Sequence, residues 1–378
     1  MAQSKPALVL GADGSLGRRI SEILFSLGIE YIPAKWSGSM KQDITGNPID
    51  FQGREIYLID GPDLSGRVKE AERSGFRVAG KVSDLNPENL SAVFDVGHKN
   101  GTIYNFANNI HPVGVPLLVQ GGTPLEKSFG LNTFASIPSA VGDTGYGRFP
   151  RAKQVSCNAT WTSTALTLAQ QSLGKTLGEI SYVILNLQRR FADTEDGEKF
   201  FNPQDMKMVH SRKYEEDVSS VLPSVQDKII TYASKNDWRT CHYGTIVILS
   251  SESINLDTVK ETFANYKRAV LLEQDLASAG VKEGMEKIIT LGEKLGLPDG
   301  DVAIPLYHPS LLDRNILCIS GYNPQRSITL PSSIDWYWSV TNKCGDWQES
   351  FSKTNAEMKL YGVKIPEIKS FLEHELNR

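Results

Sequence analysis

The stretch ALVLGADGSLGRRISEILFSL, residues 7–27, decides the fold. Apolar residues at 7–10 are followed by a glycine-rich bend at 11–17, and positions 18–27 have helical periodicity. A strand that turns through glycines into a helix leaves N–H groups at the positive helix end to receive a pyrophosphate. An ordinary glycine turn is the alternative, but the place of this bend in the first strand-turn-helix favours a dinucleotide site. The residues expected to bind the cofactor there are Gly11, Asp13, Gly14, Ser15, Leu16 and Gly17.

Later apolar runs extend this pattern. Runs at 31–32, 56–59, 92–94 and 115–119 alternate with helical or loop segments, which predicts an α/β fold with a parallel, doubly wound sheet. The polar segment 65–90 is interpreted as a helical excursion.

The character of the chain changes after residue 157. Expected strands at 180–187 and 245–249 are separated by a long polar stretch at 193–216, which indicates an α+β domain with a mixed or antiparallel sheet. Helical pattern is expected again at 256–271 and from 336 to the end.

Composition excludes several functions. A chain of 378 residues suggests two domains, and a formal charge of −4 gives no field that would attract nucleic acid or anionic lipid. The first apolar stretch stops after four residues, too short for a signal peptide or a membrane span. The four cysteines have no CxxC spacing, which argues against a zinc site or a disulfide framework and favours the reducing cytoplasm.

The end of the second expected strand bears on the choice of cofactor. The sequence YIPAKWS, residues 31–37, has no Asp or Glu to bind the ribose 2′-hydroxyl of NAD. Lys35 and Ser37 could instead meet a 2′-phosphate, which favours NADP over NAD. A solvated loop lysine is an equally good interpretation of Lys35.

Cys157 is the candidate nucleophile. It lies in QVSCNAT at an expected strand-to-helix junction, where a helix N-terminus lowers a thiol pKa and directs N–H groups toward an oxyanion. Buried cysteines are more often inert, so a base is needed, and His242 directly before an apolar strand is the candidate. Cys241 is a rival thiol, but a neighbour in a strand points to the opposite face.

Together these motifs resemble archaeal-type (type II) glyceraldehyde-3-phosphate dehydrogenases, within the wider group that includes aspartate-semialdehyde and acetylglutamyl-phosphate reductases. The resemblance spans nearly the whole chain in register. It is carried by GADGSLG at 11–17, VFDVGHKNG at 93–101, VPLLVQGGTP at 115–124, VSCNAT at 155–160, NLQRRFAD at 186–193, TCHYGTIVIL at 240–249 and ITLPSSID at 328–335.

The resemblance implies a Rossmann domain at 1–156, a catalytic domain at 157–331, a helical segment at 332–378 that packs back on the first domain, and a homotetramer. It implies that Cys157 attacks an aldehyde, that His242 is the general base, and that a backbone N–H near Asn158 stabilises the oxyanion. Inorganic phosphate then resolves the thioester. The residues expected at the substrate or phosphate are Arg189, Arg190, His210 and Thr160, and further cofactor contacts are expected at Gly97, Gly121 and Gln325. No metal is implied.

Two departures from the family bear on the substrate. KYEEDV at 213–218 stands where the family has HHGPDV, so Lys213 and Tyr214 replace two phosphate-binding histidines, and the carboxylates beside them would repel an anion. His210 could substitute for the lost histidines. Gly97-His98 replaces a Thr-Pro pair at the nicotinamide. A related oxidoreductase acting on another aldehyde or acyl phosphate, and a non-catalytic binding protein with this fold, are therefore the alternatives.

Overall fold

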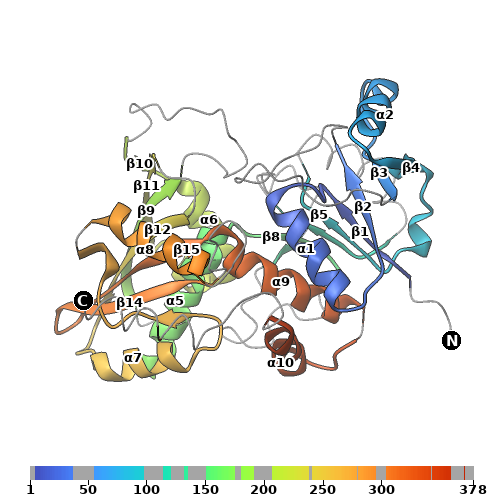
Figure 1. Cartoon of the computed structure of the whole chain (residues 1–378). Helices are drawn as coiled ribbons and strands as arrows, with labels where there is room; N and C mark the ends of the chain where they lie inside the picture. Colours follow the sequence, from blue (N-terminus) through green and yellow to red (C-terminus); the bar gives the residue numbers. More distant parts are fainter. Residues whose placement is uncertain are drawn as a thin grey trace. The chain divides into compact units, whose positions relative to one another are not determined.

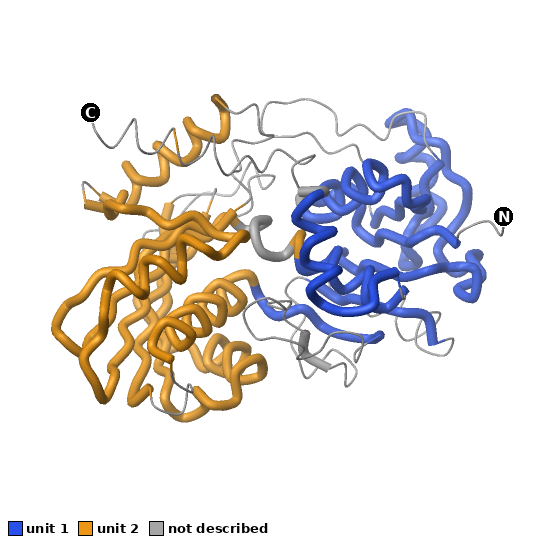
Figure 2. The backbone as a smooth tube through the Cα atoms, turned by 90° about the horizontal axis from the view of Figure 1, so that it is seen from below, with its two compact units in different colours: residues 1–138, 143–156, 332–357 blue, residues 139–142, 157–331, 358–378 orange. Residues whose placement is uncertain are grey.

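The computed structural model forms two compact units (Figures 1 and 2). Unit 1 comprises residues 1–138, 143–156 and 332–357, and unit 2 comprises residues 139–142, 157–331 and 358–378. The structure describes residues 5–36, 55–97, 114–120, 132–134, 150–174, 180–190, 207–237, 241–278, 280–294, 304–341, 343–358 and 370.

Unit 1 is built on an eight-stranded sheet of order β4-β3-β2-β1-β5-β6-β8-β7. Its strands are β1 (Ala7–Leu10), β2 (Tyr31–Lys35), β3 (Glu55–Leu58), β4 (Arg77–Lys81), β5 (Ala92–Asp95), β6 (Leu117–Val119), β7 (Asn132–Phe134) and β8 (Arg151–Gln154). Every pairing is parallel, and the strand order reverses direction at β1. The predicted doubly wound α/β sheet is confirmed. The helical interpretation of 65–90 is partly wrong, because helix α2 (Leu64–Arg73) is followed by edge strand β4 and two single 3₁₀ turns, η1 (Val82–Asp84) and η2 (Pro87–Asn89).

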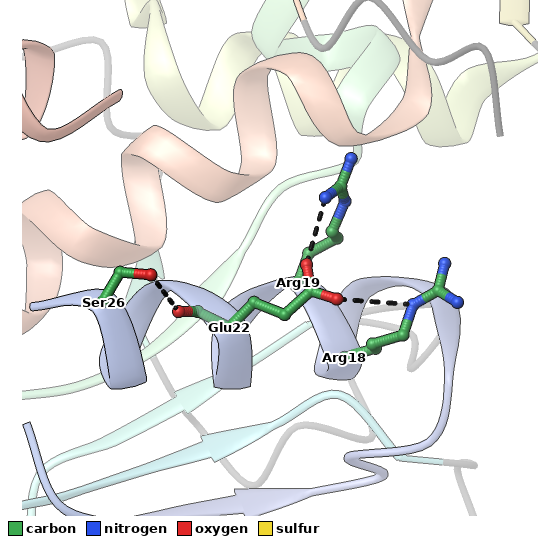
Figure 3. Close-up of polar contacts among 4 residues, drawn as sticks. All are labelled: Arg18, Arg19, Glu22 and Ser26. Carbon is green, nitrogen blue, oxygen red and sulfur yellow. Dashed lines mark hydrogen bonds and ion pairs between the residues drawn. The ribbon is translucent and has the colours of Figure 1, made fainter. Parts of the chain in front are cut away.

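Helix α1 (Ser15–Ser26) begins one residue after Gly14, which is its N-cap. Its apolar face buries Ile20, Ile23 and Leu24. On its polar face Glu22 pairs with Arg19 at 3.0 Å and with Arg18 at 4.0 Å, and its carbonyl accepts from the Ser26 hydroxyl (Figure 3). These contacts span one helical turn, so they stabilise the helix that follows the glycine bend.

The chain returns to unit 1 near its end through helices α9 (Gln325–Val340) and α10 (Trp347–Met358). Phe94 of β5 packs against Trp336 and Tyr337 of α9, with ring centroids 5.5 and 6.0 Å apart. The buried Asp335 carboxylate accepts hydrogen bonds from Ser350 and Thr354 of α10 at 3.2 and 2.7 Å. An apolar stack and a buried polar contact thus hold residues 332–340 of α9 and most of α10 in unit 1.

Unit 2 is built on a mixed, seven-stranded sheet of order β10-β11-β9-β12-β15-β14-β13. Its strands are β9 (Ile180–Arg190), β10 (Val209–His210), β11 (Ile229–Asn236), β12 (Cys241–Ser250), β13 (Val270–Leu271), β14 (Leu306–Asp313) and β15 (Ile316–Pro324). The predicted mixed sheet is confirmed. The helix predicted over 256–271 is too long, because α7 (Leu256–Asn265) ends early and Val270–Leu271 pairs with β14.

Helices pack on both faces of this sheet. Among the described residues of unit 2, the other helices are α5 (Cys157–Leu173), α6 (Arg212–Val221), α8 (Val281–Lys294) and the short turns η8 (Pro223–Val225) and η9 (Leu276–Ser278). Gly244 of β12 faces α5, because a Cβ there would lie 2.6 Å from the Trp161 ring. Cys241 and Tyr243 instead pack with Met285 of α8. Alternate residues of β12 therefore face opposite helices.

No helix among the described residues is both long and apolar enough to span a bilayer.

Candidate active site

The glycine bend of unit 1 has the close backbone contacts that a dinucleotide turn requires. Gly11 has φ +79°, and a Cβ there would lie 2.7 Å from the Gly97 Cα, so the turns after β1 and β5 touch. A Cβ at Gly17 would lie 2.1 Å from the Gly11 oxygen, so α1 starts against the end of β1. The first N–H groups of a helix have no partner within it, so the start of α1 offers donors at the point where the strand order reverses. These residues fit a pyrophosphate.

Lys35 is not the solvated loop lysine that one of its two interpretations predicted. It is the last residue of β2, its side chain is fully buried, and its ammonium lies 3.6 Å from an Asp13 carboxylate oxygen. The same ammonium lies 3.8 Å from the centre of the Phe76 ring. Lys35 is therefore not solvated, and it would have to leave the acidic residue of the glycine bend in order to meet a 2′-phosphate.

Cys157 is the first residue of α5 and follows β8 by two residues, as the sequence predicted. Burial raises the pKa of the Cys157 thiol, while charge from Arg190 and Arg189, the backbone N–H of Asn158 and a hydrogen bond from Asn323 all act to lower it. The pKa of Cys157 is raised overall, so the side chain is a thiol at neutral pH in the absence of ligands. The groups that stabilise negative charge are nonetheless already arranged around the sulfur.

His242 lies within β12 and not before it, and its ring is buried. The backbone N–H of Arg190 donates to Nδ1 at 3.3 Å, so the neutral ring carries its proton on Nε2. Burial, then Arg190 and Arg189, hold the pKa of His242 well below its usual range. The ring is therefore neutral at physiological pH and presents an N–H donor from Nε2.

Asn323 is a site residue that the sequence did not reveal. Cross-strand pairing of β12 and β15 places it opposite His242, and its side chain is almost fully buried. Its Nδ2 donates to Asn158 Oδ1 at 3.1 Å, and it also hydrogen-bonds to the Cys157 sulfur. Only the register between two strands about 75 residues apart brings Asn323 here, and no local motif signals it.

The paired arginines end β9 beside these groups. Both act electrostatically on Cys157 and on His242, so the four residues share one site. The Arg189 Nε is buried with no hydrogen-bond partner, which leaves a charged donor for an anion.

The KYEEDV segment behaves differently from expectation. Glu215 does not face the arginine site through a free carboxylate, because its Oε1 accepts from the Thr231 N–H at 2.7 Å and pairs with His210 at 2.8 Å. His210 lies on β10, two strands from β9, and its partner in the sheet is Tyr232. The structure therefore does not bring His210 to the arginines, and Glu215 is not placed to repel an anion there. Tyr214 is the member of this segment that faces the cysteine.

The roles of the other predicted site residues stay predictions, and the structure gives the positions of some of them. Thr160 is fully buried in the first turn of α5, and Gly97 lies beside Gly11. Gln325 begins α9, but its side chain lies outside the described residues, as do Ser37 and Gly121.

Fold and site together define a class of protein: α/β chains that join a doubly wound dinucleotide-type sheet to a mixed sheet, with a cysteine at the start of the first helix that follows. The solved structure of aspartate semialdehyde dehydrogenase II from Vibrio cholerae, complexed with ASA, has this fold. It matches with a TM-score of 0.56 at 10% identity and covers 91% of this chain and 100% of that chain. No established family model matches the sequence.

The particular relatives are archaeal. The glyceraldehyde-3-phosphate dehydrogenase of Picrophilus torridus is 23% identical over 325 residues, which cover 81% of this chain and 84% of that protein. The glyceraldehyde-3-phosphate dehydrogenase of Sulfurisphaera tokodaii is 22% identical over 362 residues, covering 93% and 96% respectively. The resemblance found in the motifs is confirmed, and the chain is a divergent relative of these dehydrogenases.

Proposed function

We propose that this protein is a phosphorylating, NAD(P)-dependent aldehyde dehydrogenase that acts through a thioester on Cys157, with glyceraldehyde 3-phosphate as the substrate. The observation that carries the proposal is the set of donors and cations around the sulfur: the Asn158 N–H, the Asn323 amide and the two arginines of β9. The archaeal relatives carry the choice of substrate.

Unit 1 is the dinucleotide-binding domain in this proposal, and unit 2 is the catalytic domain. The fit of the glycine bend supports the cofactor, whose nicotinamide supplies the hydride acceptor. The preference for NADP requires Lys35 to exchange Asp13 for a 2′-phosphate, since the two are paired in the structure. Comparing the Kd of NAD and NADP for wild type and Asp13→Asn tests this, because loss of the partner should favour NADP.

The reaction begins when the Cys157 thiol releases its proton to solvent water. The resulting thiolate forms a bond to the aldehyde carbon, and the carbonyl oxygen becomes an oxyanion. Loss of hydride from that carbon leaves a thioester. A phosphate oxygen then attacks the thioester carbon, the carbon–sulfur bond breaks, and the products are an acyl phosphate and the thiolate. The Asn158 N–H and Asn323 stabilise negative charge on the sulfur, which favours both its attack and its departure.

His242 was predicted as a general base, and the geometry gives it a different role in this proposal. With Nδ1 occupied by the Arg190 N–H, the neutral ring cannot accept a second proton while this hydrogen bond persists. Its Nε2–H is a donor for the developing oxyanion. Arg189 and Arg190 would hold the anion of the substrate or the inorganic phosphate, with Nε of Arg189 available.

A homo-oligomer is also proposed. Pairing of four adjacent strands aligns Ile230, Ile184, Val247 and Cys318 in one row on one face of the sheet. None of the four is fully buried, and Ile184 is exposed, as is Tyr232 farther along β11. A second copy would cover this apolar row. Light scattering of wild type and Ile184→Lys tests it, and a tetramer that persists in the variant argues against this face.

The cytoplasmic location stays a prediction. All four cysteines are free thiols, which suits a reducing compartment.

Reduction of NAD or NADP by the purified protein, with glyceraldehyde 3-phosphate and inorganic phosphate, tests the activity. We expect phosphate-dependent turnover that Cys157→Ser abolishes. Absence of turnover across a pH series, in protein that remains folded, would refute it.

A second candidate is a relative acting on another aldehyde or acyl phosphate. It is favoured by Tyr214, a buried tyrosine near the cysteine where the family has a histidine. A panel of aldehydes with and without phosphate separates the two, because turnover without phosphate would favour the second. A non-catalytic role predicts that iodoacetamide labels Cys157 no faster than Cys318 or Cys344.

A further inference from the structure

Tyr214 is held in the site by two contacts, one through its ring and one through its hydroxyl. It projects from α6, which packs against α5 and β11, and only 7% of the residue is exposed. The guanidinium carbon of Arg189 lies 5.5 Å from the centre of the Tyr214 ring. The phenol oxygen accepts a hydrogen bond from the Asn158 side chain and feels the charge of Cys157.

The amide of Asn158 connects this phenol to the nucleophile. Asn158 Oδ1 accepts from Asn323 Nδ2 at 3.1 Å, so its Nδ2 is the group that faces Tyr214. Asn323 in turn hydrogen-bonds to the Cys157 sulfur. A chain of contacts therefore runs from the phenol through two buried amides to the thiol.

We propose that Tyr214 is a positioning and specificity-determining residue of the Cys157 site: its ring orients Arg189 toward the anion, and its hydroxyl orients the Asn158–Asn323 pair that holds the sulfur. The role of the ring in holding the anion rests on the proposed function, whereas the role of the hydroxyl at the thiol does not. Tyr214 also explains how the segment KYEEDV serves a site that lacks the family's histidines. Glu215 turns to Thr231 and His210, while Tyr214, one residue earlier, faces the arginine.

The two roles are separable by substitution. Tyr214→Phe keeps the ring over Arg189 and removes the hydroxyl, whereas Tyr214→Leu removes both. Tyr232→Phe, on β11 of the same unit and exposed, is the matched control. The charged or titratable groups that act on the Tyr214 hydroxyl are Arg189, Cys157 and Asp217, so a pH profile reports on this group of residues.

The first measurement is the rate of alkylation of Cys157 by iodoacetamide across a pH series in cofactor-free protein, corrected for the other thiols with Cys157→Ser. We expect Tyr214→Phe to slow alkylation at neutral pH about threefold or more, with its midpoint moved to higher pH, because one neutral hydrogen bond has about this worth. Tyr232→Phe should match wild type. An unchanged profile in Tyr214→Phe overturns the role of the hydroxyl.

The second measurement is the steady-state dependence on inorganic phosphate. We expect KM for phosphate to rise about three- to tenfold in Tyr214→Leu and to stay unchanged in Tyr214→Phe, since a cation–π contact to Arg189 is lost only in the first. Equal KM values in all variants would overturn the role of the ring. If Tyr214→Leu does not fold, Tyr214→Met removes the ring with a longer, flexible side chain in its place, and an unchanged phosphate KM overturns the role equally. If the proposed function is wrong, the wild-type protein will show no turnover. The alkylation rates would still test the role of the Tyr214 hydroxyl at the thiol, because they need no substrate.

Discussion

Replacing Asn323 by aspartate tests the site through a single atom. The substitution keeps the shape of the side chain and exchanges the Nδ2 donor for an oxygen. In the structure this donor lies 3.1 Å from Asn158 Oδ1 and also serves the Cys157 sulfur. The variant would place two acceptor oxygens face to face and add a buried negative charge beside the thiol.

The expected size follows from the energy of a hydrogen bond to a charged group. Such a bond contributes about 1.5–3 kcal/mol, and about 1.4 kcal/mol corresponds to one pH unit in a pKa. Loss of the donor alone should therefore move the midpoint of Cys157 ionisation up by about one to two pH units. At a fixed neutral pH the thiolate fraction then falls about 10- to 100-fold, and charge repulsion adds to this.

Alkylation by iodoacetamide over a pH series, read at Cys157 by peptide mass spectrometry, measures the effect without any substrate. Asn315→Asp is the matched control, because Asn315 directly precedes β15, the strand that carries Asn323. Its Nδ2 donates to the Ser250 carbonyl at 3.2 Å, away from the site. Asn315→Asp should alkylate as wild type does. A wild-type profile in folded Asn323→Asp would refute the assignment of Asn323 to the thiol.

Four further predictions concern Gly17, His242 and Asp335. Gly17→Ala should destabilise unit 1 by about 1–3 kcal/mol and weaken dinucleotide binding, because the new Cβ would lie 2.1 Å from the Gly11 oxygen. Gly345→Ala is the control, since its Cβ would meet nothing nearer than 3.5 Å. Equal melting temperatures of the two variants would contradict the clash at Gly17. His242→Gln, which keeps an N–H donor, should retain more kcat than His242→Leu, whereas equal losses in both variants would favour a general base. Because the pKa of His242 is lowered, wild type should lose stability as pH falls below the unfolded-state value of about 6.5, by at most about 1.4 kcal/mol per pH unit, and urea unfolding of His242→Gln should show a smaller loss. Asp335→Ala should cost about 2 kcal/mol and expose α10 to proteolysis, because the Ser350 and Thr354 hydroxyls lose a buried acceptor; resistance equal to wild type would contradict this.

Local sequence was enough for the parts of the fold whose cause is local. The glycine bend predicted β1 and α1 because only glycine permits the 2.1 Å approach at position 17 and the positive φ at position 11. It was not enough for β4 and β13, which are short and paired only at a sheet edge, so their strand state depends on a neighbour distant in sequence. Helical periodicity at 256–271 therefore continued past the real end of α7 at Asn265.

The candidate site divides in the same way. Cys157 was predictable because a cysteine at a strand-to-helix junction has a local signature. Asn323 was not, since its role follows from cross-strand pairing with His242. The burial of Lys35 was not predictable, because its partner Asp13 lies in the turn after the neighbouring strand β1. A lysine that looks solvated in the sequence is buried in an ion pair with that residue.

Strand register also explains how residues from separate strands of unit 2 reach one site. His242 and Asn323 are direct partners on β12 and β15, and Tyr243 pairs with Gln188, so the arginines that follow on β9 lie at the same end of the sheet. A shift of β12 by one residue would turn His242 to the face where Cys241 packs against α8 and would bring Cys241 to the site. The close approach of the Trp161 ring to Gly244 is one of the buried contacts that fix this register. The pairing of β9, β12 and β15 therefore brings the histidine, the amide and the arginines together, whereas the KYEEDV segment, which lies in α6, supplies other groups around the thiol.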